Sequence, residues 1–242
     1  YDFHLYNNNN FLSKIFRGIA GPIELGIKSI ISYFAKEYSI YIYTGSYVLN
    51  EGPDVYNVGF LFGPDGKCLG TQRKTHIVEF EKQIGFKRDS KLEVFPFNPE
   101  GFTFTDLKIA IPVCMDATYF ETFAIARKMG ADIVAIPIAN MEEYSLWRAL
   151  RGIWPRVQES YVYGLKASLN GWIAGMHFTG KAGIFAPIGI TPHKNGVIAL
   201  APQHEGNYLI TACLDIQKLY EERSKAEYYG DKNYVFETNL GS

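Results

Sequence analysis

Apolar residues recur at two different spacings along the chain. Between residues 23 and 38 they fall three or four positions apart, which is the spacing of one face of an amphipathic helix. Pro22 suits the first turn of that helix. Residues 1–17 contain four consecutive asparagines and predict an irregular segment. Further helices are predicted over residues 119–129, over residues 145–160 with a break at Pro155, and over residues 217–228.

Runs rich in β-branched and aromatic residues predict strands between these helices. Residues 56–77 have the pattern strand, "GPDG" turn, strand, which is typical of a hairpin. Other strands are predicted over residues 39–49, 108–113, 131–139, 161–168, 171–180, 182–189, 196–202 and 208–216. Because strands and helices alternate without a linker or an internal repeat, we expect one α/β domain over residues 1–242, with mixed sheets covered by helices.

Composition and charge narrow the class of protein. The 242 residues are 47% hydrophobic and 20% charged, which is ordinary for a globular domain with one core. A net charge of -1 gives no basic surface for nucleic acid or anionic membrane, so neither is expected as a partner. The three cysteines are odd in number and widely spaced. They argue against a disulfide framework or a zinc site, and they favour the reducing cytoplasm.

Candidate chemistry begins at Cys114 in the stretch "KIAIPVCMDATYFET". This thiol lies where a predicted apolar strand ends and a helix is about to begin. Ligand sites in α/β sheets lie at the carboxyl ends of strands, and the amides of a helix N-terminus favour a thiolate. An isolated cysteine at such a point also fits simple core packing. Cys114 is therefore a candidate nucleophile that needs an activating partner.

The stretch "GTQRKTHI" offers that partner in Lys74. A nucleophilic thiol needs a neighbouring group that favours its charged form, and none of the five histidines shares a local motif with Cys114. A lysine beside a thiolate stabilises it and can stabilise the oxyanion of a tetrahedral intermediate. A lone lysine is usually solvated, so the residues alone leave this role for Lys74 open.

Three blocks in order carry a family resemblance: the lysine block, the C-x-D block at Cys114, and the pattern F-x-G-x-x-x-I-x-x-P-x-G over residues 178–189. Together they resemble the nitrilase, or carbon–nitrogen hydrolase, superfamily over essentially the whole chain. The resemblance implies a four-layer α-β-β-α sandwich without metal or other cofactor. It also implies hydrolysis of a non-peptide C–N bond in a small amide, carbamoyl amine or nitrile, through a thioester or thioimidate, with an amidase favoured over a true nitrilase.

The resemblance also assigns roles to individual residues. Cys114 would be the nucleophile, Lys74 the oxyanion-stabilising lysine, and the backbone amide of Met115 the second oxyanion donor. A second carboxylate would match Asp89 in "FKRDS", and Glu79 and Glu81 are expected to be surface charges. Residues flanking the cysteine, Asp116 and Glu121, would anchor its turn. Lys74 and Cys114 would then face each other at the carboxyl ends of two neighbouring strands, on the floor of one pocket whose expected walls are Tyr119, Asn140 and Trp147.

One family feature has no match here. The general-base glutamate of the family ends its first long strand, and the first residues of this chain contain no glutamate; Glu24 lies on a predicted amphipathic helix and fits a solvated role. We therefore expect the chain to lack its native N-terminal strand and helix. Two alternatives stay open: a noncatalytic assembly subunit of the same fold, and an unrelated Cys–His hydrolase. Family members pair through the helices predicted at 119–129 and 145–160, which implies a homodimer or larger homo-oligomer.

Overall fold

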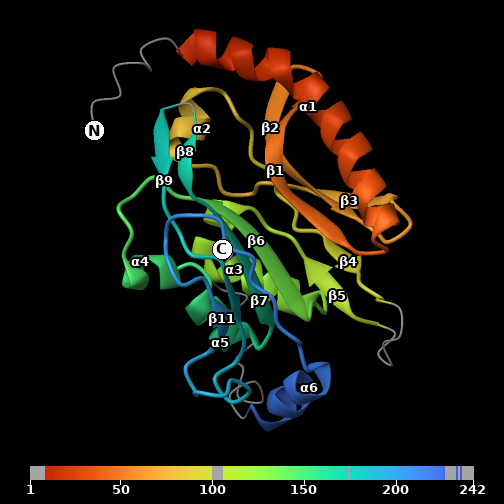
Figure 1. The fold of residues 1–242 in the computed structure, drawn as a ribbon, viewed down its shortest axis with the longest axis vertical. Coiled ribbons are helices and arrows are strands. Elements are labelled where there is room, and N and C mark those ends of the chain that lie inside the picture. The colour runs from red at the N-terminus through yellow and green to blue at the C-terminus, as the bar shows by residue number, and fades with distance from the viewer. Residues whose placement is uncertain (1–8, 100–105, 174, 227–232, 234, 236–242) are drawn as a thin grey trace.

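A computed structural model of the chain describes residues 9–99, 106–173, 175–226, 233 and 235 (Figure 1). Its helices are α1 (Asn9–Glu37), α2 (Glu79–Gln83), α3 (Phe120–Lys128), α4 (Leu146–Leu150), α5 (Trp154–Ser160) and α6 (Ile216–Lys225), with a 3₁₀ turn, η2 (Cys114–Thr118). Its strands are β1 (Ile42–Glu51), β2 (Asp54–Phe62), β3 (Cys68–Arg73), β4 (Val94–Pro96), β5 (Lys108–Ala110), β6 (Ile133–Ala139), β7 (Tyr163–Leu169), β8 (Gly171–Ile173), β9 (Met176–Phe178), β10 (Gly183–Phe185) and β11 (Val197–Leu200).

The first sheet is an antiparallel meander, β1-β2-β3, with the long helix α1 lying across it (Figure 1). The predicted "GPDG" turn joins β2 to β3. Ala35 of α1 packs with Leu49, Val58 and Phe60 of this sheet. The helix keeps its apolar side on the strands because residues three and four apart share one helix face.

The second sheet has six strands in the order β11-β10-β7-β6-β5-β4. Its centre, β5-β6-β7, is parallel, and the strands on either side of that centre are antiparallel. Helices α3 and α5 pack against this centre through Phe123, Ala126 and Val157. Parallel neighbours bring their carboxyl ends to one edge of the sheet, so the segments after β5 and β6 end side by side.

The two sheets share an apolar cluster. Leu61 of the first sheet packs with Ile109, Ile133 and other residues of the second. The Tyr43 hydroxyl of β1 donates a hydrogen bond to the Ile111 carbonyl at 3.0 Å. The chain is therefore a mixed α/β protein, as its sequence predicts, with helices on sheets that pack together.

The N-terminal prediction is wrong in part. Helix α1 already begins at Asn9, and Pro22 lies inside it and not at its start. Tertiary contacts hold the part of α1 that precedes Pro22: the Arg17 guanidinium donates to the Pro53 carbonyl at 2.6 Å, and the Asn50 amide donates to the Arg17 carbonyl at 2.7 Å. Such contacts outweigh the weak local preferences of an asparagine-rich segment. Residues 1–8 lie outside the described residues.

Two strand predictions also need correction. Residues 208–216 form no strand, and Leu209 is 89% exposed, because a strand needs a neighbour to bond to and this segment has none among the described strands. The run 171–180 is the short hairpin β8–β9, in which Gly175 adopts a positive φ of 78°.

The helix predicted over residues 145–160 is two short helices, with Pro155 in the first turn of the second. None of the described helices is long and apolar enough to cross a membrane.

Candidate active site

Cys114 occupies a tight turn directly after a buried segment. Val113 is fully buried, and Cys114 begins η2 with a φ of 49°. A residue other than glycine rarely adopts this left-handed conformation, and such strain persists only where the surroundings fix the backbone. The thiol is half-buried, and its sulfur lies 3.9 Å from the Ala139 carbonyl oxygen at the end of β6. The turn therefore presents the thiol at the edge where β5 and β6 end.

Asp116 holds this turn against the segment that follows β3. Its fully buried carboxylate accepts hydrogen bonds from the Val113 amide at 2.9 Å, the His76 amide at 2.7 Å and the Thr75 hydroxyl at 2.9 Å. The cysteine turn comes from the six-stranded sheet, and Thr75 and His76 come from the three-stranded sheet. The carboxylate thus ties together the two segments that carry Cys114 and Lys74.

Lys74 forms a buried ion pair. Its side chain is 2% exposed, and its ammonium contacts both carboxylate oxygens of Glu81, at 2.9 and 2.7 Å. Glu81 also accepts bonds from the Asn57 amide at 2.9 Å and the Val78 amide at 2.8 Å. Buried charges are retained when they are paired and hydrogen-bonded in this way.

Asp89, which was expected to be the second carboxylate of the site, does not pair with the Lys74 ammonium. Asp89 faces the Arg73 guanidinium at 3.5 Å, and it touches Lys74 only through the backbone, where its amide donates to the Lys74 carbonyl. Glu79 is exposed, as expected, but the same expectation for Glu81 is wrong. Helix α2 turns Glu81 inward, where it accepts the amide of Val78 just before the helix. A glutamate at the third position of a helix often accepts a backbone amide just before the helix, and this pattern in the sequence could have indicated that Glu81 turns inward.

The predicted meeting of Lys74 and Cys114 needs a different geometry. They do not end two neighbouring strands, because Lys74 follows β3 of one sheet and Cys114 follows β5 of the other. Asp116 links the segment that follows Lys74 to the turn that carries Cys114. Sequence patterns do not reveal which sheet a strand joins, and this is why the expectation of two neighbouring strands was wrong.

The three residues expected to form the pocket walls have different surroundings. Tyr119 stacks on His76 with ring centroids 4.0 Å apart, and His76 in turn lies 3.1 Å from Asp116. Asn140 follows Ala139, and its carbonyl accepts the Thr179 amide at 2.9 Å. Trp147 is 80% exposed, so within one chain it encloses nothing. Met115 is the second residue of η2, next to the thiol.

Two titratable groups near the thiol were not predicted from the sequence. Burial raises the pKa of the Tyr43 hydroxyl well above its ordinary value, and the charges of Asp116 and Cys114 raise it further. Burial lowers the pKa of Lys166 on β7 to about 8, and the neighbouring Cys114 partly offsets this effect. Neither residue lies in a motif, and only the packing of the sheets reveals them.

A Cys–His pair finds no support in the described part of the chain. There the nearest partner of the Cys114 sulfur is the Ala139 carbonyl, and His76 bonds to Asp116 and Thr75. Within the same residues, no group of three or more His, Cys, Asp or Glu side chains could hold a metal ion.

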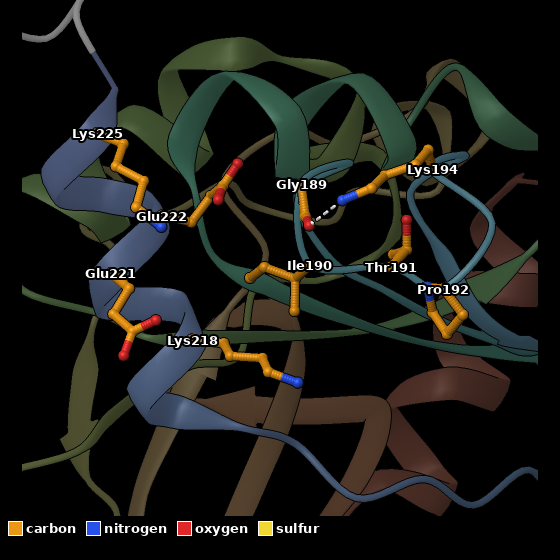
Figure 2. A pocket seen from close by; sticks show the side chains of 9 residues that line it. All are labelled: Gly189, Ile190, Thr191, Pro192, Lys194, Lys218, Glu221, Glu222 and Lys225. Carbon is orange, nitrogen blue, oxygen red and sulfur yellow. Dashed lines mark hydrogen bonds between the residues drawn. The ribbon is translucent and has the colours of Figure 1, made fainter.

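A cleft with a volume of about 390 Å³ lies beside α6 (Figure 2). It lies between α6 and the loop at residues 189–194 and is lined by Lys218, Glu221, Glu222 and Lys225. Charges of both signs alternate around it, and Lys194 donates to the Gly189 carbonyl at 2.7 Å. None of the site residues predicted from the sequence lines this cleft.

Comparisons with known proteins agree on one family. A family model described as carbon-nitrogen hydrolase matches residues 19–221. A nitrilase from Pyrococcus abyssi is 27% identical over 81% of this chain and 71% of its own length. Omega-amidase NIT2-B from Xenopus laevis is 26% identical over 90% and 77%. The probable hydrolase YhcX from Bacillus subtilis is 27% identical over 70% of this chain, which spans 33% of YhcX.

Solved structures share the fold. A carbon-nitrogen hydrolase from Helicobacter pylori superposes with a TM-score of 0.75 at 19% identity, covering 93% of this chain and 78% of that one. An amidase from Nesterenkonia sp. AN1 superposes with a TM-score of 0.67 at 17% identity, covering 90% and 80%.

Proposed function

Because the chain belongs to the carbon–nitrogen hydrolase family of the nitrilase superfamily, we propose that it hydrolyses a non-peptide C–N bond through a covalent intermediate on Cys114. The family predicted from the three sequence blocks is thereby confirmed. We propose a small amide as the substrate class, ahead of a carbamoyl amine or a nitrile.

The observation that carries this proposal is the joining of two segments by one buried carboxylate. Asp116 bonds both to the turn of Cys114 and to the residues that directly follow Lys74. The segments that carry a half-buried thiol and a buried ammonium are thus attached to the same carboxylate. Reactive groups that act together must be held in fixed geometry, because their contribution to rate depends on orientation.

In the proposed reaction, the Cys114 sulfur forms a bond to the amide carbon, and the carbonyl oxygen becomes an oxyanion. The Met115 amide and Lys74 would bind this oxyanion. An ammonium has three N–H groups, and Glu81 accepts two of them, which leaves the third for the oxyanion. The amine then leaves with a proton, and water cleaves the thioester to release the acid and restore the thiol.

The role of Glu81 in this scheme is to position Lys74. Its oxygens already accept bonds from Lys74, Asn57 and Val78. Among the described carboxylates, none is hydrogen-bonded to the Cys114 sulfur, so we assign the removal of the thiol proton to none of them.

Amide chemistry is favoured by what is recorded for a protein of the same fold. A mutant of the Nesterenkonia amidase shows covalent addition of the acetamide moiety of fluoroacetamide at its active-site cysteine. The catalytic turn of this chain has the same kind of group, a thiol at the start of η2, available for such an addition.

Ammonia release from a panel of small amides and nitriles tests the proposal. Cys114→Ala should abolish release, because no other residue replaces the nucleophile. Lys74→Ala should slow it about a hundred- to a thousandfold, as the loss of one oxyanion donor does. Cys68→Ala is the matched control, since Cys68 is a free, exposed cysteine on β3, and it should leave release unchanged. Release that survives Cys114→Ala would contradict the proposal.

We also propose the finer architecture that the family implies: α1, the three-stranded sheet, the six-stranded sheet, and α3 with α5 as four successive layers. The shared clusters between each adjacent pair support this order. A homo-oligomer is proposed on the apolar residues that α3 and α4 leave exposed, and a cytoplasmic setting on the free cysteines.

A further inference from the structure

Lys166 is a second buried lysine near the cysteine turn, and its surroundings differ from those of Lys74. It lies on β7, is 7% exposed, and stands opposite Ile136 of β6 and Gly183 of β10. Its ammonium contacts the Ala149 carbonyl of α4 at 3.4 Å. In the described part of the chain, no carboxylate lies within ion-pair distance of it. A buried cation without an anionic partner is costly, so its presence calls for an explanation.

The position of Lys166 relates it to the thiol through β6. That strand pairs with β7 from Ile133 to Ala139, and Ala139 is the residue whose carbonyl faces the Cys114 sulfur. Lys166 lies opposite Ile136, three residues before Ala139, a separation of about 10 Å along a strand. The charge of Cys114 favours the charged form of Lys166 and partly offsets the effect of burial on its pKa.

Two other roles for Lys166 fit the contacts less well. A purely structural lysine would satisfy its three N–H groups with carboxylates or several carbonyls, and here one long contact to Ala149 is recorded. A general base must reach the proton that it removes, and no hydrogen bond joins Lys166 to the Cys114 sulfur. An interaction through space, between the ammonium and a thiolate, uses the observed burial and position without requiring contact.

We propose that Lys166 is a positioning residue whose buried ammonium stabilises the thiolate form of Cys114 from the side of the six-stranded sheet. Lys74 would act from the three-stranded sheet, where Glu81 already neutralises most of its charge. Lys166 is therefore the less compensated of the two cations, and burial strengthens its effect. The inference rests on the proposed function of Cys114 as the nucleophile.

Other charged or titratable groups also surround the thiol, and a substitution at Lys166 leaves all of them in place. Tyr43 approaches from β1, Asp116 lies within η2, and His76 and the Lys74–Glu81 pair lie after β3. For Lys166 itself, the facing residues on β6, β10 and α4 are Ile136, Gly183 and Ala149, which carry no charge. A comparison of variants at Lys166 therefore isolates its own contribution.

The test is the rate at which iodoacetamide alkylates Cys114 between pH 6 and 10, followed by mass spectrometry of the cysteine peptides. Lys166→Met removes the charge and keeps the apolar stem. At pH 7 it should slow Cys114 labelling about tenfold, which corresponds to a shift of about one pH unit in the profile. The plateau at high pH should stay unchanged, and Lys166→Arg should restore most of the rate at pH 7. Cys68 in the same molecule serves as the internal control.

A Lys166→Met profile that superimposes on the parent profile, with circular dichroism showing an intact fold, would overturn the inference. Ammonia release by the parent protein is measured separately and reports on the proposed function. A shifted profile without ammonia release from any substrate would uphold the role of Lys166 and contradict the proposed function. Ammonia release by the parent protein together with an unshifted Lys166→Met profile would support the proposed function and contradict the role of Lys166.

Discussion

At the scale of single residues, the site depends on which carboxylate neutralises which cation. The Lys74 ammonium is buried and bonded to both oxygens of Glu81, whereas Asp89 faces Arg73 near the surface. Removing one partner of a buried pair leaves an uncompensated charge, which costs far more than removing one partner of an exposed pair. The two carboxylates are therefore expected to respond very differently to neutralisation.

Glu81→Gln should lower the free energy of unfolding by about 3 kcal/mol and should also slow ammonia release, because Lys74 loses its charge partner and its fixed position. The matched variant Asp89→Asn should change stability by less than about 0.5 kcal/mol. Urea denaturation gives both values. Equal effects of the two substitutions would show that Glu81 does not hold Lys74 in solution.

Lys166 gives a pH-dependent stability whose sign is fixed by its pKa. Burial lowers this pKa to about 8 in the folded protein from 10.5, so between these values the unfolded chain binds more protons. The contribution of Lys166 to stability should therefore rise as pH increases from 8 to 10.5 and be lost as pH falls through 8. Near pH 7, Lys166→Met should be more stable than the parent by on the order of 3 kcal/mol.

Thermal unfolding at several pH values measures this difference between parent and variant. The difference should shrink above pH 8 and be small near pH 10.5. A Lys166→Met protein that is less stable than the parent at pH 7 would show that the lysine makes a stabilising contact.

Residue identities near the thiol could be predicted from the sequence only where they lie in a motif. Lys74, Cys114 and Asp116 belong to short blocks with a chemical reason for their spacing. Glu81 was missed because a glutamate in a polar stretch is usually exposed, and only the packing of α2 turns it inward. Lys166 was missed because its environment is created by strands and helices far apart in the sequence.

At the scale of elements, the Asp116 carboxylate joins two chain segments that belong to different sheets. It accepts bonds from the Val113, Thr75 and His76 amides in a fully buried position. Glu121, the other acidic residue expected to anchor this turn, is exposed in the first turn of α3. Both residues were expected to anchor the turn, but only Asp116 has the burial and the hydrogen bonds of an anchor.

Asp116→Ala should reduce the free energy of unfolding by about 3–5 kcal/mol, because several buried N–H groups lose their acceptor. Glu121→Ala should cost less than about 0.5 kcal/mol. Urea denaturation of the two variants in the same buffer makes the comparison. Similar midpoints for both would mean that the Asp116 junction contributes little to holding the sheets together.

Helices and strands were predicted well where the hydrophobic periodicity is strong. They were predicted poorly where formation of the element depends on contacts with distant parts of the chain. The parallel strands β6 and β7 and the helices α3 and α6 lie close to their predicted positions. The segment 208–216 has a strand-like composition but no strand beside it among the described residues. Helix α1 begins earlier than predicted, and its part before Pro22 is bonded through Arg17 to Asn50 and Pro53. Local pattern carries no information about such distant contacts.

At the scale of the whole molecule, several large apolar side chains of α3 and α4 are left exposed. Phe120 and Ile125 of α3 are exposed, and so are Met129, which directly follows α3, and Leu146 and Trp147 of α4. Large apolar patches on a folded protein commonly mark interfaces. Trp147, which encloses nothing within one chain, is suited to contact a second copy.

The parent protein should therefore be a homodimer or larger in light scattering at micromolar concentration. Ile125→Glu combined with Trp147→Glu should lower the mass to that of one chain, because two charges would be buried in the interface. Leu25→Glu is the control, since Leu25 is an exposed apolar residue on α1, and it should leave the mass unchanged. A monomeric mass for the parent protein would contradict the predicted assembly.

The most direct test of Cys114 as the nucleophile is to incubate the protein with fluoroacetamide and map the adduct by peptide mass spectrometry. Displacement of fluoride should place one acetamide moiety on the Cys114 sulfur. Cys68 and Cys213 should remain free although both are exposed, because this weak electrophile needs an activated thiol. Lys74→Ala should sharply reduce the adduct. An adduct that forms on Cys68 or Cys213 in preference to Cys114, or no adduct at all, would contradict the assignment.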